Sequence, residues 1–249
     1  MNLVASIETR PFNNKLQEKL REDQQMMKQL PDIIVPADKT GNYYAVPPPD
    51  YKRFVSNSIT NEYMKVDPNL VDEINVEAAN IASRLKLDDR IDALGLNEAY
   101  ITIKDHKPNF PNRLDFRVIN PSKPPIGKIS KKLLEDINKQ VREATAVGQC
   151  RSTREVLEWF SNIEEKNKKC FIQYDIEAFY PSISEELLLK SLSFAKNFTH
   201  ISEEDIETIM HSRRSVLVSQ NAIWMKKINP EFDVTMGSMD GAEVCELCG

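Results

Sequence analysis

The stretch Phe171-Ile-Gln-Tyr-Asp-Ile-Glu-Ala-Phe-Tyr-Pro-Ser-Ile183 combines a short apolar run, one carboxylate at Asp175 and an aromatic pair. Residues 171–176 have the pattern of a short buried strand, and the proline and serines that follow are suited to end it and to cap a helix near Glu185. Asp175 is therefore expected at a switch from strand to helix. A carboxylate placed there is suited to Mg²⁺, which takes oxygen ligands and keeps part of its water shell for substrate phosphates.

A second interpretation fits this stretch equally well when it is taken alone. Asp175 would be a turn or helix N-terminal carboxylate, and Phe179 and Tyr180 would be core aromatics. The neighbouring segments have to decide between the two.

Composition indicates a protein that can bury a full core, since the chain has 249 residues of which 41% are hydrophobic. No apolar run approaches the roughly 18 residues that a membrane span needs, and residues 1–10 lack the charged start and apolar core of a signal peptide. We therefore expect an intracellular protein, nuclear or cytoplasmic, with no membrane partner. The four cysteines are too few and scattered for a disulfide framework, and Cys245 and Cys248 lack the second ligand pair of a typical zinc site.

Charge is unevenly distributed along the chain. Residues 101–132 hold eight basic and two acidic side chains, a local charge of +6 in a chain whose net charge is −5. Such a stretch is either a solvated loop or a grip for phosphates.

Short strands and longer helices mix without strict alternation, which predicts an α+β fold. The periodicity and capping residues predict helices at residues 14–30, 50–57, 70–86, 129–143, 153–163, 185–198 and 203–211, with a last one after residue 240. Besides 171–176, strands are expected at residues 33–35, 42–46, 100–103 and 116–119, and one ending at Trp224.

Several segments in order resemble reverse transcriptases of Penelope-like retroelements. An apolar run, Asp175 and an aromatic five residues later look like the first catalytic motif, and Tyr100-Ile-Thr-Ile-Lys-Asp-His-Lys-Pro-Asn109 followed by Phe116-Arg-Val-Ile119 looks like the fingers motif. Thr235-Met-Gly-Ser238 resembles a second palm motif, although the Pro-Leu-Ser-Pro string common after it is replaced here, as is a glutamine just upstream.

The resemblance implies right-hand polymerase fingers plus an incomplete palm, mostly helical with short strands and a small antiparallel sheet. The expected divisions are an N-terminal helix at residues 1–31, an extension of the fingers at 32–99, the fingers at 100–165 and a partial palm at 166–249. The implied partners are an RNA template, a DNA primer and deoxynucleoside triphosphates, and the implied cofactor is Mg²⁺.

By the same resemblance, Lys104, Lys107 and Arg117 hold the triphosphate, because lysine supplies point charges and arginine a bidentate fork. Arg113 could replace Arg117, and His106 is expected to be structural.

Asp175 and the Ile176 carbonyl are the implied metal ligands, and Tyr180 would exclude a ribose 2′-hydroxyl. Gly237 and Ser238 would line the template side. Lys39 is an expected template contact, with an exposed turn lysine as the alternative.

These polymerases need a second carboxylate motif, usually an aromatic-x-Asp-Asp hairpin, and the sequence up to Gly249 has none after the opening stretch. We therefore expect this chain to be inactive in nucleotidyl transfer by itself. Two alternatives stay open. One is a non-enzymatic nucleic-acid-binding remnant, and the other is an RNA-directed RNA polymerase, against which Tyr180 argues.

Overall fold

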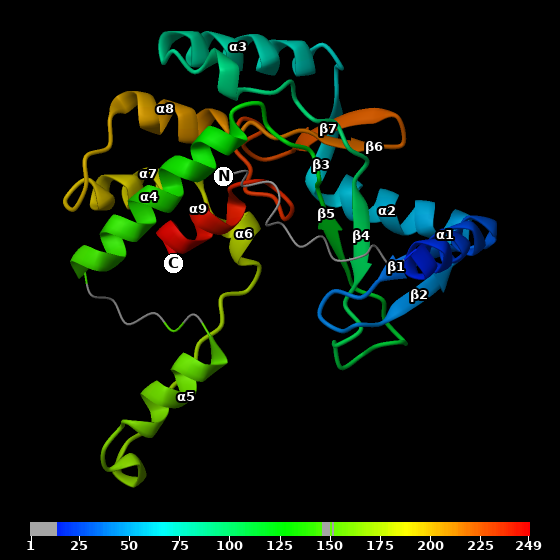
Figure 1. The fold of residues 1–249 in the computed structure, drawn as a ribbon, viewed down its shortest axis with the longest axis horizontal. Coiled ribbons are helices and arrows are strands. Elements are labelled where there is room, and N and C mark those ends of the chain that lie inside the picture. The colour runs from blue at the N-terminus through cyan, green and yellow to red at the C-terminus, as the bar shows by residue number, and fades with distance from the viewer. Residues whose placement is uncertain (1–13, 146–149, 151) are drawn as a thin grey trace, which may run out of the picture. The chain divides into compact units, whose positions relative to one another are not determined.

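The computed structural model describes residues 14–145, 150 and 152–249, and within them the chain forms an α+β fold (Figure 1). The first 13 residues of the expected N-terminal helical division lie outside this range. The described helices and strands follow in chain order as α1 (Asn14–Gln29), β1 (Ile33–Pro36), β2 (Tyr43–Val46), α2 (Pro48–Glu62), β3 (Tyr63–Val66), α3 (Leu70–Arg84), β4 (Tyr100–Ile103), β5 (Phe116–Ile119), α4 (Gly127–Thr145), α5 (Thr153–Ser161), α6 (Phe179–Ser182), α7 (Glu185–Ala195), α8 (Glu203–His211), β6 (Leu217–Ser219), β7 (Ala222–Lys226) and α9 (Gly241–Cys248). Two short 3-10 turns lie at Asp88–Arg90 and Lys166–Lys168.

The chain divides into two compact units. The first comprises Met1–Ser56 and Thr102–Phe116, and the second comprises Asn57–Ile101 and Arg117–Gly249. The chain therefore passes between the units within α2, within β4 and at the start of β5.

The first unit is built around a two-stranded antiparallel ladder. Strands β1 and β2 pair from Ile33 with Val46 to Pro36 with Tyr43, and Ala37 continues into a parallel bridge with Ile103. Val35 and Ile103 are buried here. Both strands lie where the sequence predicts them.

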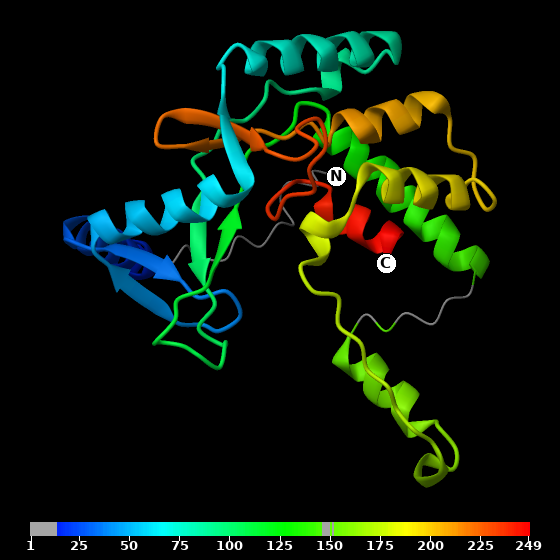
Figure 2. The same ribbon diagram turned by 180° about the vertical axis from the view of Figure 1, so that it is seen from behind.

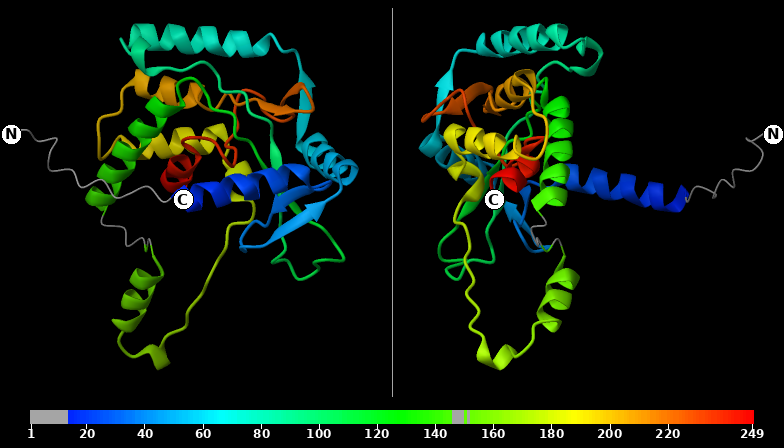
Figure 3. Two further views of the ribbon diagram at one scale, coloured as in Figure 1. Left: turned by 45° about the vertical axis from the view of Figure 1, so that its right-hand side comes forward. Right: turned by 90° about the vertical axis from the view of Figure 1, so that its left-hand side faces the viewer.

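The second unit combines a small sheet with a helical core. Strands β3, β7 and β6 lie in that order and pair antiparallel. Helix α4 packs on α8 and α9, and α9 packs on α7, as the views in Figures 2 and 3 show. The core side chains between these helices include Leu134, Ile137, Leu188, Leu192, Ile209 and Val244.

Helix starts in this unit follow their capping residues. The Ser184 hydroxyl accepts a hydrogen bond from the Leu187 amide at 3.1 Å and begins α7, which confirms the predicted start. Ser202 and Asp205 form a reciprocal capping box at the start of α8, also as predicted.

The expected strand at residues 171–176 is wrong. This segment has no regular secondary structure, and Phe171, Ile172, Tyr174 and Ile176 are between 48% and 87% exposed. A strand needs a partner to satisfy its backbone groups, and no strand of the described residues pairs with this one. The apolar pattern of residues 171–176 is therefore not enough to form a strand.

Residues 63–66 form a strand that the sequence does not predict. They form β3, which pairs with β7 from Tyr63 opposite Lys226 to Val66 opposite Ile223.

Among the described residues, no helix has both the length and the apolar character to cross a bilayer.

Candidate functional site

Asp175 and Ile176 lie in the irregular segment that leads into α6. Both are exposed, and the backbone then turns at Ala178, whose φ is 50°. This left-handed residue starts the short α6 that carries Tyr180. Asp175 therefore lies in an irregular segment just before a short helix.

Tyr180 is half-buried against α9. Its hydroxyl shares a hydrogen bond with the Cys245 thiol, and burial is the main reason why the tyrosine pKa is raised. The positive charge of Arg117 acts in the opposite direction and lowers it. Burial also raises the pKa of the Cys245 thiol to about 11, so this thiol is protonated at neutral pH.

Gly237 lies in close contact with the end of β5. Its φ is 99°, and a Cβ placed on it would lie 2.6 Å from the Asn120 carbonyl oxygen and 3.1 Å from Ile119 Cγ2. The Asn120 amide donates to the Met236 carbonyl at 2.9 Å. Only glycine fits this position without a shift of the backbone.

Ser238 continues the same loop toward α6. Its hydroxyl donates to the Thr235 carbonyl at 2.8 Å. A Cβ on Gly241, the first residue of α9, would clash with Ser238 Oγ and would lie 3.3 Å from Tyr180 Cε1. The Met236-Gly-Ser loop is therefore packed between the end of β5 and α6.

Three of the sequence-predicted segments consequently come together in the second unit. Arg117 in β5 is near enough to influence the titration of Tyr180, and the loop of Gly237 and Ser238 touches both β5 and the surroundings of α6. Asp175 belongs to the same unit but is not among the residues in contact.

A buried carboxylate at Asp240 anchors this loop, and sequence reasoning missed it. Asp240 accepts hydrogen bonds from Ser130 Oγ at 2.5 Å and Ser212 Oγ at 2.9 Å, and it forms an ion pair with Arg213. The side chains of Arg213 and Asp240 are both fully buried. Each of these residues appears in the sequence as an ordinary polar residue, so no local signal marks the network.

The remaining predicted basic residues, Lys39, Lys104 and Lys107, lie in the first unit. The Lys104 amide donates to the Asp115 carbonyl at 2.9 Å, and the Lys107 amide donates to the Lys104 carbonyl at 3.2 Å. The two lysines therefore lie on one tight turn after β4.

Asp105 ties that turn to the β1–β2 connection that carries Lys39. Its Oδ2 accepts from Thr40 Oγ1 at 2.6 Å, Asn42 Nδ2 at 2.9 Å and the Tyr44 hydroxyl at 2.8 Å. These hydrogen bonds, led by that of Thr40, lower the pKa of Asp105, and the bond to Asp105 raises the pKa of Tyr44. The three predicted lysines thus lie on two connected loops, and Asp105 is a positioning residue that the sequence motif did not reveal.

The expected Mg²⁺ ligands do not complete a metal site by themselves. Asp175 offers one carboxylate, and no group of three His, Cys, Asp or Glu side chains suited to a metal ion occurs within residues 14–145, 150 and 152–249. Further oxygen ligands would be needed.

No protein-family model matches this chain, and neither does any curated protein.

Proposed function

We propose that this chain is the nucleotide-binding part of an RNA-directed DNA polymerase, similar to the reverse transcriptases of Penelope-like retroelements. The observation that carries the proposal is the convergence of Arg117, Tyr180 and the Gly237–Ser238 loop in one unit. These residues come from three segments that were singled out separately in the sequence, and nothing in their spacing requires them to meet.

The charge arrangement supports a triphosphate ligand. Lys104 and Lys107 lie on one turn, and Asp105 fixes that turn by three hydrogen bonds. Fixed cations bind phosphate more effectively than mobile ones, because less conformational freedom is lost on binding. In this proposal Lys104 and Lys107 of the first unit neutralise triphosphate charge, Arg117 is the triphosphate-binding residue of the second unit, and Lys39 contacts the template.

The half-buried ring of Tyr180 supports a role in sugar selection. A bulky side chain on α6 that is half-buried against α9 is suited to block a ribose 2′-hydroxyl. Gly237 lets its loop, which would line the template side, approach the end of β5 closely. A bound Mg²⁺ would neutralise phosphate charge, with Asp175 and the Ile176 carbonyl as two of its ligands.

The test is binding of a fluorescent deoxynucleoside triphosphate to the full chain with Mg²⁺ present. Arg117→Ala and the double change Lys104→Ala with Lys107→Ala should each weaken binding about tenfold or more, because a charge-assisted contact contributes about 1.5–3 kcal/mol. Lys190→Ala is the matched control, since Lys190 is exposed on α7 and pairs with Glu186 at 2.6 Å. Equal affinity in all variants would contradict the proposal.

Sugar choice separates the proposal from its polymerase alternative. The unchanged chain should prefer a deoxynucleotide to the matching ribonucleotide, and Tyr180→Ala should reduce that preference. A preference for the ribonucleotide would favour an RNA-directed RNA polymerase. Salt-sensitive binding of an RNA–DNA hybrid with no nucleotide binding would favour a non-enzymatic nucleic-acid-binding protein.

A further inference from the structure

The segment at residues 170–177 leaves its backbone open along its whole length. It runs from the 3-10 turn at Lys166–Lys168 to α6, as Figure 3 shows, and the chain enters it extended, with φ −109° and ψ 144° at Lys169. All of its residues are exposed, and none of their amides or carbonyls forms a hydrogen bond with another described residue. Such a backbone is a template for a second strand.

The side chains of this segment divide between two faces when it pairs as a strand, because alternate residues of a strand point to opposite sides. One face then consists of Cys170, Ile172, Tyr174 and Ile176. Ile172 is 72% exposed and Tyr174 is 87% exposed. On the other face, Phe171 packs on the rings of Phe160 and Trp159 in α5, at centroid distances of 5.3 and 6.5 Å. The Phe171 face thus has a covering helix, and the apolar face of Ile172 and Tyr174 is bare.

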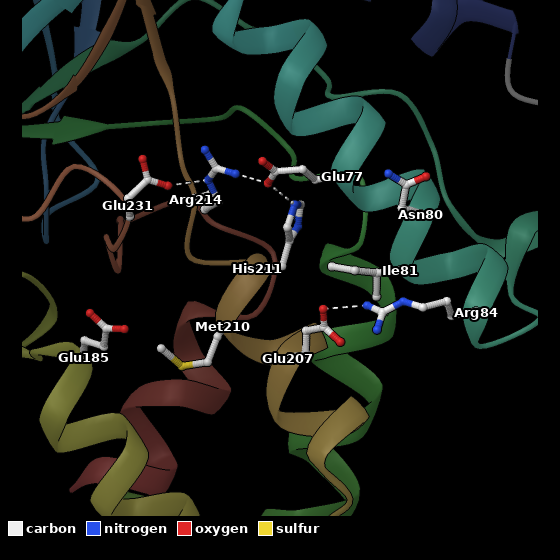
Figure 4. Close-up of a pocket in the computed structure, with 10 residues that line it drawn as sticks. All are labelled: Glu77, Asn80, Ile81, Arg84, Glu185, Glu207, Met210, His211, Arg214 and Glu231. Carbon is white, nitrogen blue, oxygen red and sulfur yellow. Dashed lines mark hydrogen bonds and ion pairs between the residues drawn. The ribbon is translucent and has the colours of Figure 1, made fainter.

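The groove between α3 and α8 shows how charged side chains are paired elsewhere in this unit. Arg84 pairs with Glu207 at 2.5 Å, and Arg214 pairs with Glu231 at 2.5 Å (Figure 4). The arginines of this groove are therefore satisfied within the chain.

The charges at the ends of the open segment have no such partners. Lys169 lies at its start and Glu177 at its end, and neither forms an ion pair with another described residue. A lysine at one end and a glutamate at the other make the segment complementary to a copy of itself that runs in the opposite direction. The charge pattern therefore selects a second copy of this chain as the partner.

The apolar pattern selects the register of such a pair. When Gln173 lies opposite Gln173 of the second copy, Ile172 faces Tyr174 and Cys170 faces Ile176, so that the two apolar faces form one continuous surface. The same register places Lys169 opposite Glu177 at both ends. A shift by one residue would instead set Ile172 opposite Gln173 and join an apolar face to a polar one.

We propose that two copies of this chain associate by antiparallel pairing of residues 169–177. The second copy supplies the strand partner that the sequence pattern requires, and two ion pairs between Lys169 and Glu177 close the ladder. An isolated two-stranded ladder is marginally stable in water, so the association is weak and reversible. This proposal does not depend on the function proposed above.

The experiment is analytical ultracentrifugation of the full chain over a concentration series at low ionic strength. The unchanged chain should show an equilibrium between monomer and dimer. Glu177→Lys sets two lysines against each other at both ends, and Lys169→Glu does the same with two glutamates, so each should weaken association about fivefold or more. An equimolar mixture of these two variants should associate as the unchanged chain does, because every lysine of one then faces a glutamate of the other.

Glu164→Lys is the matched control, because Glu164 is an exposed carboxylate just before the ladder and its reversal changes the net charge as Glu177→Lys does. It should associate as the unchanged chain does. Far-ultraviolet circular dichroism confirms that each variant is folded.

Disulfide cross-linking tests the register separately. In a chain with Cys150→Ser and Cys170→Ser, Gln173→Cys should give a linked dimer on mild oxidation, because opposite residues have Cα atoms about 4.5 or 5.5 Å apart, within disulfide range. Asn167→Cys in the same background, an exposed position outside the ladder, should not.

Several results would overturn the proposal. They are a monomer at every concentration, a dimer that persists in both charge-reversal variants, and a mixture of those variants that associates no better than its components. Weakening by Glu164→Lys equal to that by Glu177→Lys, or equal cross-linking at positions 173 and 167, would also overturn it.

Discussion

Removal of one partner from the Arg213–Asp240 ion pair should destabilise the second unit strongly. Both side chains are fully buried, and Asp240 also accepts hydrogen bonds from Ser130 and Ser212. Asp240→Leu would leave the Arg213 guanidinium buried without its counter-charge. Arg213→Met would leave the carboxylate with only the two hydroxyl donors.

The magnitude follows from the burial of the pair. Breaking a buried ion pair from one side costs about 3–5 kcal/mol, whereas replacing both partners by apolar residues of similar size is often close to neutral. In the double variant Arg213→Met with Asp240→Leu, the hydroxyls of Ser130 and Ser212 would lose an acceptor, at about 1–3 kcal/mol each if no other is found. We therefore expect the double variant to cost less than the sum of the single changes, by about 2 kcal/mol or more.

Urea denaturation is carried out on the unchanged chain, the two single variants and the double variant, and tryptophan fluorescence gives the free energy of unfolding of each. The difference between the double variant and the sum of the single variants is the coupling free energy. Lys132 and Asp136 provide a control cycle, because they form an exposed pair on α4 at 2.9 Å and should couple far more weakly than the buried pair. The reasoning fails if either single change in the buried pair costs less than about 1 kcal/mol, or if the two changes are additive.

Three further changes test other parts of the fold. Gly237→Ala should lower the free energy of unfolding by about 2–4 kcal/mol, because its positive φ and the approach to the Asn120 carbonyl both oppose a side chain; an unchanged urea midpoint would contradict this. Ser202→Ala should cost about 1 kcal/mol through loss of the capping box with Asp205, and chemical denaturation with a Ser202→Thr control measures it. The lowered pKa of Asp105 means that its stabilising effect is complete above the pKa it has when unfolded and is lost as the pH falls through its lower folded pKa; Asp105→Asn should flatten the acid limb of a stability-against-pH curve, and an unaltered limb would refute the assignment.

Elements with local signals were predictable from the sequence. The start of α8 is marked by Ser202 and Asp205, and the start of α7 by Ser184, since a cap acts on amides only two or three residues away. Strands β1 and β2 likewise follow from two short strand-like runs separated by a turn with Gly41. In each case the interactions that form the element lie within about a dozen residues.

Elements that depend on distant partners were not predictable. Residues 63–66 follow α2 directly, with no turn residue to mark a change, and they become a strand because β7 pairs with them. Residues 171–176 show the opposite case, because their pattern fits a strand but no described segment pairs with them. The pattern specifies which face would be apolar, and the partner decides whether a strand forms.

The candidate site divides in the same way. The motifs predicted Arg117, Tyr180 and Gly237 as site residues. The structure places their segments close together, and their roles stay predictions. Asp105 and Asp240 were missed because their importance lies in hydrogen bonds to residues far away in the sequence, up to 65 and 110 positions distant. No pattern of neighbouring residues reports such contacts.

The Asp240 network also provides a way to recognise distant relatives of this protein. Ser130, Ser212, Arg213 and Asp240 depend on one another, so a change at one of them is tolerated mainly when another changes with it. We therefore expect these four residues to be kept or replaced together, while surface residues change independently. A candidate relative that keeps an Arg 27 positions before the Asp, with a hydroxyl residue directly before that Arg, would share this buried arrangement even where the rest of its sequence no longer aligns.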